Sequence, residues 1–332
     1  MRYRIATLGI LLCLINARPA DADLIGPPAA SNVFSLGGLG GTGVNIQGPT
    51  VLGGDGTFRA GNLGSIYAQG NLSVVAVNAA SVLYGGNFNP QASHIGSANR
   101  ITAPLYDFDA LRSSLTAASD LVAAQTDNGI VTGDLQGNLT LTGTDPNLNV
   151  FTISPPGVNA WLRLVVPAGS MAFINVEGQA IDLTLTLLNG VSPKIGGPPP
   201  TDVFDPTHVL FNFAEATYLS MASTTVYGTI LAPRASTSVT TFTQHGTLIA
   251  GDLSILSGRF FQESFDDVRA AAILPEPASL NLAGASLGAL GIVRFFRRRI
   301  RRRRVPLRAT APGTEKTGIV PFWFIVFADP RR

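Results

Sequence analysis

The feature that most constrains the fold of this chain is a phrase that occurs twice. Residues 227–233 read YGTILAP and residues 245–251 read HGTLIAG, which places the two Gly-Thr pairs eighteen positions apart (246 − 228). Each phrase is a short apolar run between a Gly and a Pro or Gly. Self-similarity at a short fixed period is typical of stacked solenoids, because each coil buries its apolar side only against the next coil. The repeat therefore predicts a parallel β-helix, a scaffold that does not by itself imply catalysis.

Strand-like phrases also occur in the N-terminal third. Those at residues 50–54, 65–70 and 82–86 begin fifteen (65 − 50) and seventeen (82 − 65) positions apart, close to the later period. We interpret them as three coils of the same solenoid; an antiparallel meander is the alternative, since short strands between turns suit both. Residues 32–34 indicate a first strand or cap. The Gly-rich residues 37–41 lack the strand and helix context of a phosphate site, so we interpret them as a flexible turn.

One segment has helical rather than strand periodicity. Between Pro104 and Gly129, apolar side chains recur at about helical spacing, at Leu105, Phe108, Leu111, Leu115, Leu121 and Val122. The pattern predicts an α-helix over residues 104–128. Because this segment lacks the Lys/Arg face of a membrane-surface helix, we expect it to pack along the side of the solenoid or to cap it.

Apolar or alternating runs resume after the helix. Those at residues 139–142, 160–166, 172–176 and 181–187 have strand length. They form either further coils or a sheet inserted between two parts of the solenoid. Residues 191–205 contain GGPPP and indicate a surface loop, and residues 209–213 predict another strand.

The charge of the chain is strongly segregated. The whole chain has 332 residues and a net charge of +2, but residues 23–274 contain 8 Lys and Arg against 17 Asp and Glu, a balance of −9 (8 − 17). The other 15 of the 23 Lys and Arg residues (23 − 8) lie at the two ends. A nucleic-acid partner requires a basic folded body, so the acidic body excludes this class.

The N-terminus predicts an export signal. Arg2 and Arg4 precede an apolar run at residues 5–15 that is too short to span a bilayer, and Ala20 and Ala22 form a small-x-small cleavage site. We expect cleavage after Ala22. The only cysteine, Cys13, lies within the apolar run, so the mature chain would contain neither disulfides nor a catalytic thiol.

The C-terminal tail has three consecutive parts. Pro275, Glu276 and Pro277 precede an apolar segment at residues 280–293, which predicts a short membrane helix. A cationic stop follows, as positive-inside topology requires. It consists of Arg294, Arg297, Arg298, Arg299, Arg301, Arg302, Arg303 and Arg304.

Two resemblances follow from these motifs. The phrases at residues 211–213, 216–219, 227–233 and 246–251 resemble the choice-of-anchor A domain of bacterial surface proteins, a likeness that extends over roughly residues 30–265. The paired phrases are also similar to those of solenoid ice-binding domains, which supports the fold more than the activity. The first resemblance implies export and surface display, with an adhesive or matrix role and no common ligand.

The tail resembles the PEP-CTERM sorting signal of Gram-negative bacteria. This resemblance implies that Pro275, Glu276 and Pro277 are recognised by an exosortase, a membrane transpeptidase that severs the tail. The implied location is the inner membrane first and the cell surface or extracellular space after processing. Residues 305–332 depart from the pattern, because such signals normally end at the Arg cluster. A simple tail anchor is the alternative.

The domain organisation follows from these segments. We predict a signal peptide (1–22), a β-solenoid domain (23–268), a linker with the Pro-Glu-Pro motif (269–279), a membrane helix with its Arg cluster (280–304) and an atypical extension (305–332). The fold class is mainly β, with one flanking helix and a C-terminal transmembrane helix.

The residues of the body offer little catalytic chemistry. His94, His208 and His245 are too scattered in sequence to suggest a metal site, and we interpret the Asp266-Asp267 pair near Glu263 as a solvated domain edge. We therefore expect no enzyme activity and no cofactor. The most suggestive surface is rich in hydroxyl groups, because alternate residues of a coil point outward and stack from coil to coil. Its candidate binding residues are Ser236, Ser238, Thr240, Thr241 and Thr243.

The expected function is that of an exported, anchored structural or adhesive protein of the cell surface or biofilm matrix. Its expected partners are an exosortase, the membrane and an extracellular polysaccharide or matrix. A β-helix enzyme acting on exopolysaccharide and an ice-binding or lattice-binding protein are the alternatives.

Overall fold

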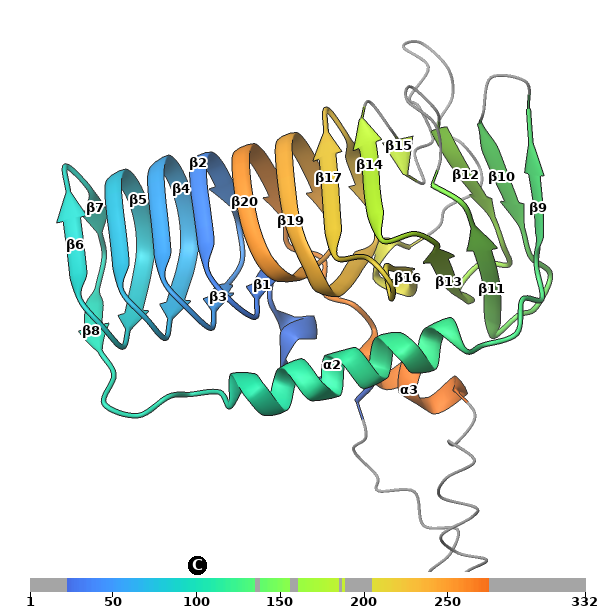
Figure 1. Cartoon of the computed structure of the whole chain (residues 1–332), viewed down its shortest axis with the longest axis horizontal. Coiled ribbons are helices and arrows are strands. Elements are labelled where there is room, and N and C mark those ends of the chain that lie inside the picture. Colours follow the sequence, from blue (N-terminus) through green and yellow to red (C-terminus); the bar gives the residue numbers. More distant parts are fainter. Residues whose placement is uncertain (1–22, 135–137, 156–160, 185–186, 189–204, 275–332) are drawn as a thin grey trace, which may run out of the picture. The chain divides into compact units, whose positions relative to one another are not determined.

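The computed structural model describes residues 23–134, 138–155, 161–184, 187–188 and 205–274. In this part the chain folds into a parallel β-solenoid (Figure 1), as the repeated phrases predict. Several predicted segments lie outside the described residues. They are the predicted signal peptide, residues 191–204 of the predicted loop, the Pro-Glu-Pro motif, the predicted membrane helix, the Arg cluster and the C-terminal extension. No described helix combines the length and apolarity needed to cross a bilayer.

The solenoid has three faces, which we call a, b and c in the order in which each coil passes through them. Face a contains β1 (Val33–Ser35), β3 (Thr50–Leu52), β8 (Ala98–Arg100), β11 (Leu148–Ile153), β13 (Met171–Val176) and β16 (Val209–Asn212). Face b contains β6 (Phe88–Gln91), β14 (Ala180–Thr184) and β17 (Tyr218–Ala222). Face c contains β7 (His94–Ile95), β10 (Leu139–Thr142), β12 (Trp161–Val165), β15 (Leu187–Leu188) and β18 (Thr225–Tyr227).

Five longer strands bend around the corners between faces. They are β2 (Leu39–Ile46), β4 (Gly56–Ala68), β5 (Leu72–Tyr84), β19 (Thr229–His245) and β20 (Leu248–Phe261). The phrase at residues 227–233 therefore does not end its strand at Pro233. β19 continues through this proline, and its register against β20 shifts between Ala232 and Ser236. The described remainder consists of β9 (Ile130–Gly133), which pairs antiparallel with β10, the short helices η1 (Pro27–Ala30) and η2 (Pro206–His208), and the helices α2 and α3.

The order of the coils along the solenoid is not their order in the sequence. β1 pairs with both β3 and β20, and β2 pairs with both β4 and β20, so the N-terminal and C-terminal coils meet in the middle. From this junction the chain runs outward to the end formed by β6, β7 and β8, crosses beside the solenoid as α2, and returns from the other end (Figure 1).

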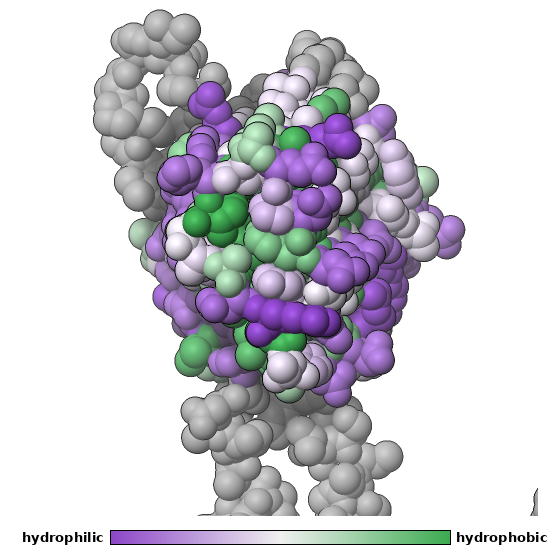
Figure 2. Space-filling model, turned by 90° about the vertical axis from the view of Figure 1, so that its left-hand side faces the viewer, coloured by the Kyte–Doolittle hydropathy of each residue, from purple (hydrophilic) through white to green (hydrophobic). Residues whose placement is uncertain are grey.

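Two apolar layers stabilise this arrangement. Inside the coils, side chains that alternate along each strand form one continuous core that includes Phe58, Phe211 and Phe242. At the end formed by β6–β8 the half-buried Phe88 and Ile95 close this core, and Figure 2 shows hydrophobic side chains there surrounded by hydrophilic ones. The second layer lies between face a and α2.

Helix α2 (Phe108–Ala123) covers face a. It buries Phe108, Leu115 and Val122 against outward-pointing apolar side chains of that face, among them Phe34, Tyr67 and Leu231. The predicted helix over residues 104–128 is therefore confirmed, but the helix in the structure is shorter at both ends. Asp107 accepts a hydrogen bond from the Ala110 amide at 3.0 Å and fixes the N-terminus at residue 108, which leaves Leu105 outside the helix and exposed.

The interpretation of residues 37–41 as a flexible turn was wrong in part, because β2 begins at Leu39. A Cβ atom at Gly41 would lie 2.8 Å from the Phe58 ring of the neighbouring coil. This glycine makes room for a buried aromatic ring, and the same strand pairs with β4 and β20 along its length.

Candidate functional site: the open faces

Faces b and c are the candidate recognition surfaces, because α2 covers face a. Parallel in-register pairing stacks equivalent side chains of successive coils at a spacing of about 4.8 Å. A side chain that points outward in one coil is therefore repeated in a straight row along the solenoid.

The middle row of face b extends across both halves of the chain. We call it the hydroxyl row, because small hydroxyl and amide side chains predominate in it. In spatial order it contains Asn89, Ser73, Thr57, Gly40, Ser254, Ser238, Ser220 and Asp182. All of these residues are exposed or half-buried, and Gly40 interrupts the row of side chains where the two halves of the chain meet.

The rows beside it are more varied. One contains Gln91, Val75, Arg59, Thr42, Leu256, Thr240 and Ala222. The other contains Asp252, Ser236, Tyr218 and Ala180. Leu256 and Tyr218 are 55% and 48% exposed, so large apolar groups flank the hydroxyl row on both sides.

The predicted binding residues separate into two groups. Ser236, Ser238 and Thr240 lie on face b, as alternate outward positions of β19. Thr241 lies instead at the corner between faces b and c, with a φ of 51°, and Thr243 lies on face c. The prediction of one face for all five was therefore wrong, because the left-handed residue at the corner turns the strand onto the next face.

Sequence reasoning missed the N-terminal half of the hydroxyl row. Thr57, Ser73 and Asn89 follow one another at sixteen-residue intervals (73 − 57 and 89 − 73), which is a detectable signal. No sequence signal shows that this part of the row is aligned with Ser254, because that alignment depends on the pairing of β2 with β20.

Face c carries two different rows. One contains His94, Asn78, Asn62, Asn45, Arg259, Thr243 and Thr225. The other is an aromatic stack in which His245 lies between Tyr227 and Phe261, with ring centroids 4.5 Å apart on each side. His245 Nδ1 also lies 3.1 Å from Glu263 Oε1, so this histidine is held as part of a coil face.

The acidic pair at residues 266–267 has a structural role. Asp266 caps α3 (Asp267–Ile273) by accepting a hydrogen bond from the Arg269 amide, and it lies 3.5 Å from His208. Asp267 is buried and accepts hydrogen bonds from the Ile25 and Gly26 amides at 2.6 and 2.7 Å. Burial raises the pKa of Asp267 above its ordinary value. The interpretation of this pair as a solvated edge was wrong for Asp267, which is buried and fastens the N-terminal segment to the domain, whereas the Asp266 side chain remains partly exposed. Within the described residues, no three His, Cys, Asp or Glu side chains cluster as a metal site.

The fold and its open faces define a class: a β-solenoid in which one face is sealed by a helix and two faces display regular side-chain rows. The chain belongs to the family described as "Putative Ice-binding-like adhesive domain", whose match covers residues 26–262. That match includes every coil and α2.

Two solved structures are similar to this chain at low identity. An ice-binding protein from the Antarctic ascomycete Antarctomyces psychrotrophicus is 12% identical, with 74% of this chain and 100% of that chain covered and a TM-score of 0.31. An ice binding protein from an Antarctic biological consortium is 14% identical, with 74% and 93% covered and a TM-score of 0.28. No curated protein matches the chain.

Proposed function

We propose that this protein is an adhesin that binds an ordered surface through face b, and that ice is this surface. The observation that carries the proposal is the hydroxyl row, which places small polar side chains at the coil spacing in both halves of the solenoid, with Gly40 between them. Membership of an ice-binding-like adhesive family supports it.

Face b is both regular and rigid, and both properties favour binding to an ordered surface. A row of short side chains on a paired sheet loses little conformational entropy on binding, because its backbone is already fixed by hydrogen bonds on both sides. Hydroxyl groups can bond ordered water directly, and Leu256 and Tyr218 beside the row add apolar area. Such a face is suited to a periodic solid better than to a small molecule, since its rows lie on the surface of a continuous sheet.

The test is adsorption of the fluorescently labelled full chain to a growing ice crystal. Ser254→Tyr places a bulky ring in the hydroxyl row at the junction of the two halves, and adsorption should fall at least tenfold. Ser113→Tyr makes the same change on an exposed position of α2 and should leave adsorption unchanged. Equal adsorption of both variants would refute a role for face b.

We further infer that the adhesin is exported and anchored by its tail. The sequence motif at Pro275, Glu276 and Pro277, the apolar segment and the Arg cluster support this inference. Deletion of residues 275–304 in the native host should move the protein from membrane or surface fractions into the medium. Replacement of Glu276 by Ala alone should block processing and leave a longer, membrane-bound form. Unchanged fractionation of the deletion would contradict the anchor.

A further inference from the structure

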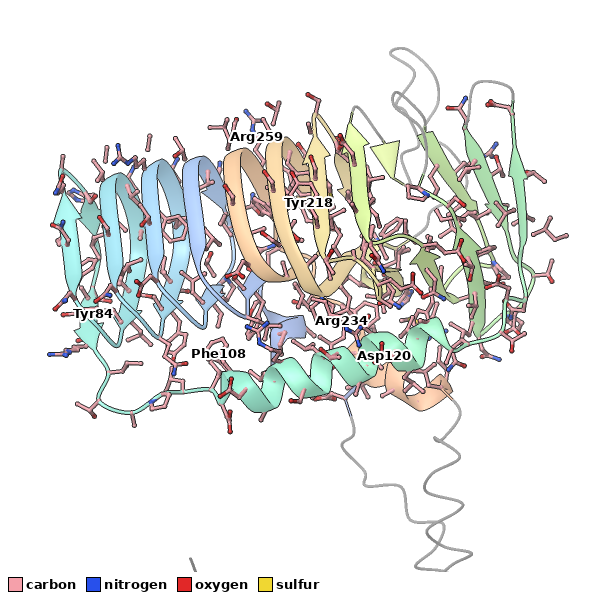
Figure 3. All side chains as sticks on the ribbon, in the orientation of Figure 1. Tyr84, Phe108, Asp120, Tyr218, Arg234 and Arg259 are labelled. Atoms are coloured by element: carbon pink, nitrogen blue, oxygen red, sulfur yellow. The ribbon has the colours of Figure 1, made fainter. Side chains whose placement is uncertain are left out.

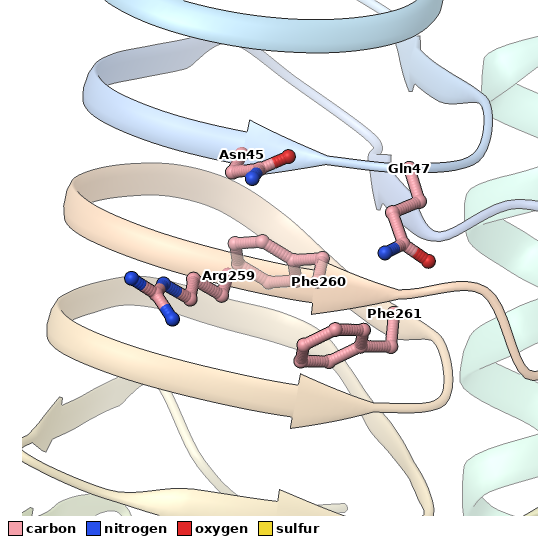
Figure 4. A pocket seen from close by; sticks show the side chains of 5 residues that line it. All are labelled: Asn45, Gln47, Arg259, Phe260 and Phe261. Atoms are coloured by element: carbon pink, nitrogen blue, oxygen red, sulfur yellow. The ribbon is translucent and has the colours of Figure 1, made fainter.

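A slot on face c is a second candidate site, and it is separate from the rows of face b. Asn45, Gln47, Arg259, Phe260 and Phe261 line it, at the place where β2 of the N-terminal half pairs with β20 of the C-terminal half (Figure 4). Its volume is 130 Å³. A shallower groove of 440 Å³ shares Asn45 and Arg259 with the slot and continues past Asn62 and Asn78.

The aromatic stack of face c ends at this slot. The Phe261 ring packs against His245 on one side. On the other side the neighbouring coil places Gln47, whose backbone N–H donates a hydrogen bond to the Phe260 carbonyl at 3.1 Å. One face of the Phe261 ring is therefore not covered by another ring. The buried Phe260 also lines the slot.

The polar side chains of the slot are available for a ligand. Among the described residues, the side chains of Asn45, Gln47 and Arg259 are exposed and have no hydrogen-bond partner, and no carboxylate lies within ion-pair distance of Arg259. By contrast, Asn62 accepts a hydrogen bond from Asn78 at 2.9 Å in the next coils. The slot therefore brings together an unpaired guanidinium, two side-chain amides and a half-buried aromatic ring.

We propose that this slot binds a uronate ring of an acidic polysaccharide whose chain lies along the groove. The C–H face of the sugar ring packs on Phe261, and the guanidinium of Arg259 holds its carboxylate in a bidentate pair. The Asn45 and Gln47 amides bond ring hydroxyls, as a few placed polar groups do in most small-molecule sites. Among the described residues, Arg259 is the only cation that lines the slot, so it selects an acidic sugar in spite of the acidic body.

Isothermal titration of the full chain with tetragalacturonate tests the proposal. We expect saturable binding that weakens with added salt and that Arg259→Gln reduces at least tenfold. Arg100→Gln removes the same charge at the end of β8, outside the slot, and should bind as the wild type does. Phe261→Ala should also lose affinity, and Gln47→Ala, at an exposed position, provides a second variant if the aromatic change destabilises the fold.

Three outcomes would overturn the proposal: no saturable binding, an equal loss in Arg100→Gln, or equal affinity for neutral cellotetraose. Ser254→Tyr on face b should leave tetragalacturonate binding intact. Failure of this site and failure of the ice-binding face are therefore distinguishable.

Discussion

At the scale of single residues, two glycines in the repeated phrase are required by the way coils stack. Gly228 and Gly246 have φ values of 137° and 136°, which side chains rarely adopt. A Cβ atom at Gly246 would lie 2.3 Å from the Gly228 carbonyl oxygen of the neighbouring coil. The Gly-Thr signature of the sequence therefore reflects close backbone approach rather than flexibility.

Gly246→Ala should consequently lower the free energy of unfolding by about 2–5 kcal/mol, from backbone strain and overpacking together. Gly40→Ala is the matched control, since a Cβ atom there meets nothing within 4 Å. Its effect should lie between zero and a stabilisation of about 1 kcal/mol. Urea denaturation of both variants measures the difference; equal costs would show that coil stacking does not constrain residue 246.

Asp267 should give the stability a specific pH dependence. Its folded pKa is raised above the ordinary value of 3.8, mainly by burial. The folded state therefore holds the proton more tightly than the unfolded chain, so this contribution is greatest below about pH 3.8 and is lost as the pH rises through the raised pKa.

The free energy of unfolding of the wild type minus that of Asp267→Asn should therefore fall as the pH rises from acid toward neutrality. Urea titrations of both proteins at a series of pH values measure this difference. A difference that rises with pH would mean that the two amide bonds, rather than burial, dominate the pKa of Asp267.

At the scale of elements, α2 is attached to face a by a buried polar network. Ser119 donates a hydrogen bond to Asn212 Oδ1 at 2.6 Å, and Asn212 donates to the Ser119 carbonyl and to Asn175 Oδ1, each at 2.9 Å. Beside this network, Arg234 and Asp120 form an ion pair at 2.7 Å on the surface (Figure 3). The two contacts are close in space but differ in burial.

Burial should decide their energies. Ser119→Ala leaves Asn212 Oδ1 without its donor in a buried site and should cost about 1–3 kcal/mol. Asp120→Ala breaks an exposed pair and should cost less than about 1 kcal/mol. Thermal or urea unfolding distinguishes them, and a larger loss for Asp120→Ala would place the attachment of α2 in the ion pair.

Helical periodicity identified α2, because the side chains that pack against face a recur at helical spacing in the sequence. Strand phrases such as residues 50–54 and 82–86 were also identifiable, since their apolar side chains pack alternately in the core and in the layer beneath α2. The hydroxyl side chains of β19 could not be divided between faces b and c in the same way. That division depends on the left-handed conformation of Thr241, and threonine rarely adopts it, so no residue-type signal marks the corner.

At the scale of the whole solenoid, the spatial order of the coils could not be predicted from the sequence. Val33 pairs with Leu248, 215 positions away (248 − 33). A repeat period shows that coils stack on similar coils but not which coil is the neighbour. The joining of the two halves at β1, β2 and β20 also aligns the two parts of the hydroxyl row on either side of Gly40, and it forms the slot beside Phe261.

We propose that the N-terminal and C-terminal halves of the solenoid together present one ice-binding face. Ser73 belongs to the N-terminal coils and Ser238 to the C-terminal coils, and both lie in the hydroxyl row. The decisive measurement is the ice adsorption of the full chain carrying Ser73→Tyr or Ser238→Tyr. Each substitution alone should reduce adsorption at least tenfold, with unchanged thermal stability. Loss in only one variant, or in neither, would contradict it.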